Sequence, residues 1–63
     1  MTAPMRCVST RGGRVYLCPC GETFRAHAAE PEELQVWVAD HRPHTDGTCV
    51  EVLAAGGAYT RDL

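Results

Sequence analysis

Apolar and polar residues alternate in short runs through the first part of the chain. The segments "MRCVST", "RVYLC" and "ETFRA" are rich in Val, Tyr, Thr and Phe, and "RGG" and "PCG" separate them. Residues of the first kind favour strands, whereas glycine and proline mark turns. The pattern predicts two successive β-hairpins that turn at residues 11–13 and 19–21. A three-stranded meander and a single hairpin with a loose first strand fit it equally well.

The spacing of apolar residues changes after the second predicted hairpin. Leu34, Trp37, Val38 and His41 fall at positions i, i+3, i+4 and i+7. Residues at this spacing lie on one face of a helix. The second half of the chain is therefore expected to contain one amphipathic α-helix.

Signals at both ends delimit this helix. Pro31 suits a first helical position, and Glu32 and Glu33 complement the positive end of the helix dipole. Pro43 disfavours the α conformation in the residue before it. The helix is therefore expected to start near Pro31 and to end before Pro43, with His44 in the loop that follows.

The last third of the chain carries one further strand signal. "HTDGT" is expected to form a turn and "CVEVL" a short final strand. Residues 1–4 and about 54–63, which include the Gly-rich stretch "AAGGAYTRDL", are expected to be the least ordered. The sequence thus predicts a single domain over residues 1–63, with an ordered core over about residues 5–53. Its fold class is small α+β, with one or two β-hairpins followed by one α-helix and a short C-terminal strand.

Length and composition suggest that the fold needs additional support. With 63 residues, a single apolar core is marginal, and disulfides, a metal or oligomerisation commonly add stability. No apolar run has the length of a signal peptide or a membrane span, so we expect a cytoplasmic protein. In that reducing compartment, the four cysteines favour a metal site over a disulfide framework.

Two pairs of potential metal ligands lie about one helix length apart. Cys18 and Cys20 flank a single proline, and Gly21 permits the dihedral angles of a tight loop that brings two thiolates together. His41, at the end of the predicted helix, and His44, behind it, can both point back to this loop. The two pairs together predict a structural Zn²⁺ site. A site closed by four protein ligands leaves no open position for water, so no enzymatic activity is expected.

With this order of elements, the chain resembles a two-cysteine, two-histidine zinc finger over roughly residues 15–44. A cysteine pair, a glycine, an aromatic residue, a helix and a histidine pair carry the resemblance. The intervals within the first pair, between the pairs and within the second pair are one, twenty and two residues. The family usually has about two to four, about twelve and about three to five. The resemblance implies a ββα unit, the four zinc ligands Cys18, Cys20, His41 and His44, and a small core of Phe24, Val38 and Leu34.

Other roles for the cysteines and histidines stay open at this stage. Cys49 can replace His44 as the fourth ligand if the preceding turn folds back. Cys7 is expected to be a buried hydrophobe and His27 a solvated loop residue. Without zinc, His41 would be a favourable cation at the helix C-terminus. A small redox or metal-handling protein is the third functional interpretation. It is disfavoured because a disulfide across "CPC" would be strained and easily reduced, and because the usual redox spacing of two residues is absent.

Charge is distributed unevenly along the chain. Residues 1–28 carry a net charge of +3 and the remainder carries −5, which gives the overall −2. The predicted helix opens with "EPEEL", and its glutamates would face phosphates if the helix entered the major groove of DNA.

All six basic residues are arginine, and Ala and Gly are abundant, which suggests a bacterial or phage origin.

These features favour a regulatory adaptor that acts through protein–protein contacts, with transcription as its expected setting. The acidic helix would dock onto a basic partner or onto a second copy of the chain, through Glu32, Glu33 and Val36. The alternative is a nucleic-acid-binding module. In that case phosphates would contact the arginines of the predicted hairpins, Arg11, Arg14 and Arg25.

Overall fold

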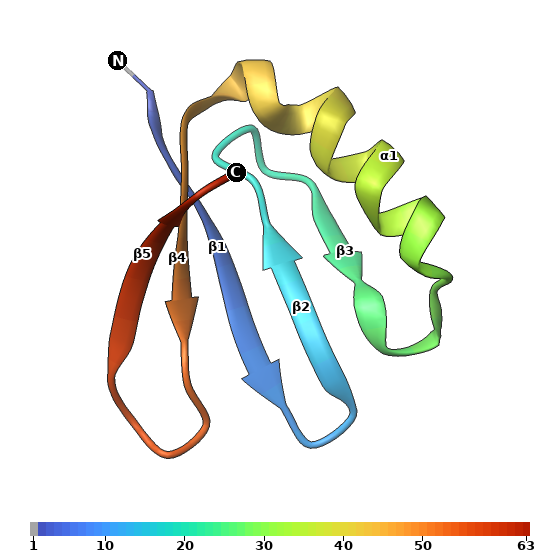
Figure 1. Ribbon diagram of the computed structural model, residues 1–63, viewed down its shortest axis with the longest axis vertical. Helices are drawn as coiled ribbons and strands as arrows, with labels where there is room; N and C mark the ends of the chain where they lie inside the picture. The colour runs from blue at the N-terminus through green and yellow to red at the C-terminus, as the bar shows by residue number, and fades with distance from the viewer. Residues whose placement is uncertain (1) are drawn as a thin grey trace.

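The computed structural model describes residues 2–63, apart from the side chain of residue 28. Three strands precede one α-helix, and two further strands follow it (Figure 1). Short 3₁₀ helices lie before and after the α-helix. In chain order the elements are β1 (Ala3–Thr10), β2 (Gly13–Leu17), β3 (Thr23–Arg25), η1 (Ala26–Ala28), α1 (Pro31–His41), η2 (Arg42–His44), β4 (Thr45–Val52) and β5 (Ala58–Asp62). This arrangement confirms the small α+β class.

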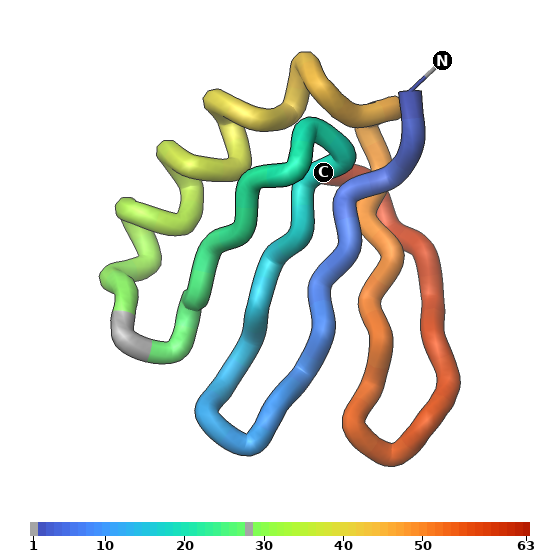
Figure 2. The backbone as a smooth tube through the Cα atoms, turned by 180° about the vertical axis from the view of Figure 1, so that it is seen from behind, coloured from blue at the N-terminus to red at the C-terminus, as the bar shows by residue number. Residues whose placement is uncertain are grey.

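All five strands form one mixed sheet in the order β3-β2-β1-β4-β5. The central pair, β1 and β4, is parallel, and every other neighbouring pair is antiparallel. Parallel neighbours need a crossover connection, and α1 supplies it by carrying the chain from the β3 edge back to the middle of the sheet. In both views α1 runs along the β3 side of the sheet (Figures 1 and 2).

The two predicted hairpins are confirmed as a three-stranded meander. β1 pairs with β2 from Arg6 and Leu17 to Thr10 and Gly13, and β2 pairs with β3. Gly13 has φ 129°, and a Cβ at this position would lie 2.1 Å from the Cβ of His27. Glycine is therefore required at residue 13 both by its backbone angle and by the close approach of η1.

The predicted helix is confirmed at both ends. Pro31 occupies its first turn, with Glu32 and Glu33 beside it, and the last residue is His41. Residues 42–44 continue as a 3₁₀ turn instead of an open loop. β4 follows at once, with Thr45 as its first residue. The expected turn over "HTDGT" is therefore a strand over residues 45–48, and His44 ends the 3₁₀ turn.

The C-terminal segment differs from the expected loose tail. Residues 58–62 form β5, which pairs with β4 from Thr48 and Asp62 to Val52 and Ala58. The turn between them is closed by the Leu53 N–H, which donates to the Gly57 carbonyl at 3.0 Å. Gly57 and the glycine before it have φ 97° and 90°, angles that favour glycine. A Gly-Gly pair between two segments of alternating apolar and polar residues is a hairpin signal. The prediction of a loose tail did not use this signal.

The buried core is small and rich in sulfur. It comprises Met5, Cys7, Tyr16, Cys18 and Cys49. Cys7 is buried, as predicted. Other apolar side chains pack against this cluster while remaining partly exposed: Phe24, Ala26, Leu34, Trp37, Val38 and Leu63. Phe24, Leu34 and Val38 therefore contribute to the core as expected, but as its border.

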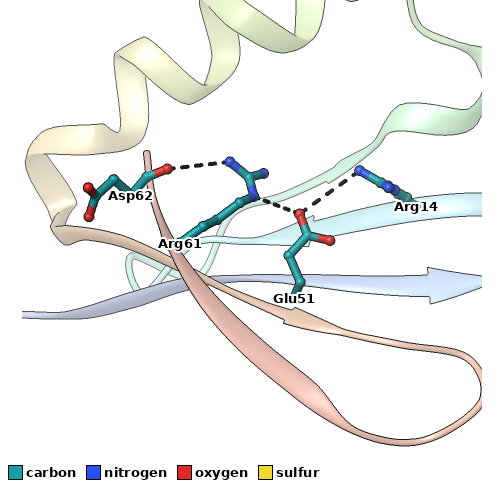
Figure 3. A network of polar contacts seen from close by, with 4 residues as sticks. All are labelled: Arg14, Glu51, Arg61 and Asp62. Atoms are coloured by element: carbon teal, nitrogen blue, oxygen red, sulfur yellow. Dashed lines mark hydrogen bonds and ion pairs between the residues drawn. The ribbon is translucent and has the colours of Figure 1, made fainter.

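One charged side chain is buried beside this core. Glu51 is 2% exposed and lies opposite Cys7 in the β1–β4 pairing. Arg61 donates from Nε to Glu51 Oε1 at 2.8 Å, and Arg14 places Nη1 3.9 Å from the same oxygen (Figure 3). A buried carboxylate is tolerated only when it is paired. The pairing with two arginines thus links β2, β4 and β5 on the helix-bearing side.

Removing the closer arginine should destabilise the fold more than removing the distant one. We expect Arg61→Gln to lower the free energy of unfolding by about 2 kcal/mol, because it deprives the buried Glu51 charge of its closest partner. Arg14→Gln should cost about 0.5 kcal/mol, because the longer contact comes from a more exposed side chain. Urea denaturation followed by circular dichroism measures both, and equal losses would contradict this account of the Glu51 pairing.

Candidate functional site

The predicted cysteine pair lies in the tight turn that follows β2. The Cys18 N–H donates to the Glu22 carbonyl at 2.9 Å, and the Gly21 N–H donates to the Cys18 carbonyl at 3.0 Å. Gly21 has φ 100°, which meets the conformational requirement of the turn. This geometry leaves Cys18 buried and Cys20 exposed on either side of Pro19.

The predicted histidine pair approaches the same turn from the end of α1. The Cys18 thiol donates to the backbone carbonyl of His41 at 3.8 Å. The imidazole rings of His41 and His44 lie 6.0 Å apart between centroids. Both views place the β2–β3 turn beside the C-terminal end of α1 (Figures 1 and 2). We call Cys18, Cys20, His41 and His44 the cysteine–histidine corner.

His41 is held in one orientation by its own helix. Its Nδ1 lies 2.8 Å from the Trp37 carbonyl oxygen, and its ring stacks on Trp37 with 4.2 Å between centroids. A carbonyl oxygen only accepts, so Nδ1 is the donor, and in the neutral ring Nε2 then carries the lone pair. This is the tautomer in which histidine commonly binds metals, with the other ring nitrogen bonded to a backbone carbonyl.

The side chains of the cysteine–histidine corner are not gathered as a metal site. Burial raises the pKa of the Cys18 thiol, which favours its protonated form. Within residues 2–63 as described, no three Cys, His, Asp or Glu side chains are grouped so as to hold a metal ion. The fold thus brings the predicted ligands to one corner without placing them around a common point. Zinc ligation therefore stays a prediction.

The remaining cysteines occupy other positions. Cys49, the alternative fourth ligand, is fully buried within the sheet opposite Met5 and Arg61 on the neighbouring strands. Burial also raises the pKa of the Cys49 thiol. All four cysteines are free thiols, so the structure has no disulfide across Pro19. His27, expected to be solvated, is exposed.

The three arginines predicted to contact nucleic acid lie apart. Arg11 is exposed in the β1–β2 turn. Arg14 points to the helix-bearing side of the sheet, where it approaches Glu51. Arg25 pairs with Val15, one position along β2 from Arg14, and successive residues of a strand face opposite sides. Arg14 and Arg25 therefore do not contribute to one surface.

A shallow hollow of about 470 Å³ lies along the outer side of α1. Its lining combines three apolar with three acidic side chains: Phe24, Val36, Trp37, Glu32, Glu33 and Asp40. We call it the acidic hollow. Val36 is 61% exposed, and the Phe24 and Trp37 rings pack with 5.4 Å between centroids. The predicted partner-binding residues Glu32, Glu33 and Val36 are thus brought together.

The carboxylates of the acidic hollow are free to pair with a ligand. Every ion pair within the described residues involves Glu51, so Glu32, Glu33 and Asp40 have no cationic partner there. Sequence reasoning missed Asp40 and the contribution of Trp37. Asp40 lies seven residues after Glu33, which places both on one helix face, and this spacing is the signal that could have identified it.

No known protein family, curated protein or solved structure matches this chain. Among the described residues, no helix has the length and apolar character needed to cross a membrane.

Zinc binding at the cysteine–histidine corner is testable by native mass spectrometry. We expect one zinc ion per chain, removed by a chelator, because two thiols and two imidazoles lie at one end of the fold. Cys18→Ser and His41→Ala should reduce the bound zinc strongly, whereas the control His27→Ala should retain it. A wild-type chain that takes up no zinc, or equal losses in all three variants, would contradict the ligand assignment.

Proposed function

We propose that this protein is a regulatory adaptor that binds a basic segment of another protein in the acidic hollow. The observation that carries the proposal is the combination of an exposed apolar floor with unpaired carboxylates on one helix face. The proposal extends to a role in transcription, where small adaptors act by binding a larger machine. It assigns no enzymatic activity to the chain.

The apolar floor supplies the anchor that such an interaction needs. Binding energy at protein interfaces is concentrated in a few buried aromatic or aliphatic contacts, surrounded by a polar rim. Val36, 61% exposed, offers an aliphatic surface that a partner side chain can cover. Trp37 is fixed between Phe24 and His41 by ring contacts of 5.4 Å and 4.2 Å. A floor held this way loses little conformational entropy on binding.

The acidic rim selects the charge of the partner. Glu32, Glu33 and Asp40 line the same hollow without a cation of their own among the described residues. A segment with Arg or Lys beside an apolar residue would pair these carboxylates and cover Val36 at the same time. Complementary charge raises the association rate and excludes acidic competitors. The shallow shape suits an extended or helical segment better than a small molecule.

The cysteine–histidine corner is connected to this hollow through one ring. His41 stacks on Trp37, which forms part of the floor. In this proposal a zinc ion bound by His41 would fix that stack and so hold the floor in its binding conformation. The corner then has a supporting role, and the hollow makes contact with the partner.

Synthetic peptides of defined charge and hydrophobicity test the proposal in place of the natural partner. Three peptides of equal length, composed of Arg and Leu, Arg and Gly, or Glu and Leu, are titrated into the ¹⁵N-labelled protein. We expect saturable shifts of the Trp37 indole and the Val36 amide with the Arg/Leu peptide only, because both anchor and charge are needed. Glu33→Lys should weaken this binding about tenfold, since it places a cation in the rim.

The matched control is Glu22→Lys, the same charge reversal at an exposed position in the β2–β3 turn, outside the hollow. It should leave the affinity of the Arg/Leu peptide within about twofold of the wild type. Equal binding of the Arg/Gly peptide would show attraction by charge alone and overturn the proposal. Equal loss in Glu22→Lys and Glu33→Lys would overturn the location.

A further inference from the structure

A second cleft lies on the other side of α1, between the helix and the end of β5. It has a volume of about 460 Å³. Its lining is mostly apolar with two guanidinium groups: Tyr16, Leu34, Gln35, Val38, Ala39, Arg42, Arg61 and Leu63. We call it the arginine cleft. Its size falls within the range of small-molecule sites, which are concave and lined by apolar groups with a few polar ones.

The charge of the arginine cleft is opposite to that of the acidic hollow. Arg42 and Arg61 line it, and none of the lining side chains is acidic. Arg42 follows directly on the C-terminal residue of α1, and Arg61 lies on β5. No ion pair in the described part of the chain involves Arg42. A cationic cleft on a chain of net charge −2 is a local feature that the overall composition conceals.

Arg61 is held in place from beneath the cleft. Its Nε donates to Glu51 Oε1 at 2.8 Å, and its Nη1 donates to the Asp62 carbonyl at 3.4 Å (Figure 3). Its side chain remains 40% exposed, whereas that of Glu51 is only 3% exposed. Because Arg14 also approaches the Glu51 carboxylate, this network of one acid and two arginines carries a net positive charge. An oriented arginine loses less entropy when it binds an anion.

We propose that the arginine cleft binds a small amphipathic anion, an alkyl or aryl group that ends in an oxyanion. The oxyanion pairs with Arg42 and the exposed part of the Arg61 guanidinium. The apolar body lies against Leu34, Val38 and Leu63, which border the core and line the cleft. Carboxylate and phosphate share this chemistry, since arginine binds either through parallel N–H donors.

This site is separate from the proposed partner surface. The residues that line the arginine cleft and those that line the acidic hollow form two sets with no member in common. Failure of one proposal therefore leaves the other to be judged on its own test. A substitution at Arg42 should not change binding of the Arg/Leu peptide.

Octanoate, octyl phosphate and octanol are the probes, each titrated into the ¹⁵N-labelled full chain. We expect saturable amide shifts around Leu34, Val38 and Leu63 with at least one of the two anions, and the tighter anion identifies the preferred head group. Octanol, which keeps the apolar body without the charge, should bind at least about tenfold more weakly. Arg42→Gln should weaken the binding of the preferred anion about tenfold.

Arg11→Gln is the matched control, because Arg11 is exposed in the β1–β2 turn and does not line the cleft. It removes the same charge and should leave the anion affinity unchanged within about twofold. The inference is overturned if octanol binds as tightly as the anions. It is also overturned if neither anion saturates, if the shifts map outside the cleft, or if Arg42→Gln and Arg11→Gln have equal effects.

Discussion

The parallel pairing of β1 with β4 is the contact on which the rest of the structure depends. β2 and β3 attach to one side of this pair and β5 to the other, so the pair joins two antiparallel units into one sheet. It sets Met5 against Cys49 and Cys7 against Glu51, which assembles most of the buried core across a single strand boundary. The pairing also requires a crossover connection, and the position of α1 follows from it.

The position of this crossover helix determines where the acidic hollow and the arginine cleft lie. α1 covers a small core with Leu34 and Val38 and leaves both of its flanks accessible. One flank combines exposed Val36 with unpaired carboxylates, and the other combines core-border side chains with Arg42 and Arg61. The acidic hollow and the arginine cleft thus lie on opposite flanks of α1, separated by the width of the helix. Under the two proposals, a protein partner and a small anion would bind to different faces of the chain.

Local sequence signals predicted the meander and the helix, whereas contacts between residues distant in the sequence could not be predicted. The "RGG" and "PCG" turns and the spacing from Leu34 to His41 gave the meander and the helix, because each depends on neighbouring residues. The β1–β4 pairing depends on residues more than forty positions apart. β5 is different, because it forms a local hairpin with β4 whose Gly-Gly turn signal was present in the sequence. The spacing of the cysteines and histidines predicted that they would lie at one corner of the fold. Metal coordination also depends on the rotamers of these side chains, and residue spacing carries no information on rotamers.

Native-state hydrogen exchange tests the central role of the β1–β4 pair most directly. If this pair joins the two halves, the amides of residues 5–8 and 49–52 should be among the slowest to exchange, and should open only with global unfolding. Their exchange free energies should then equal the free energy of unfolding measured with urea. Fast exchange at residues 49–52 while the β1–β2 amides stay protected would contradict the account, because the meander would then be stable without β4.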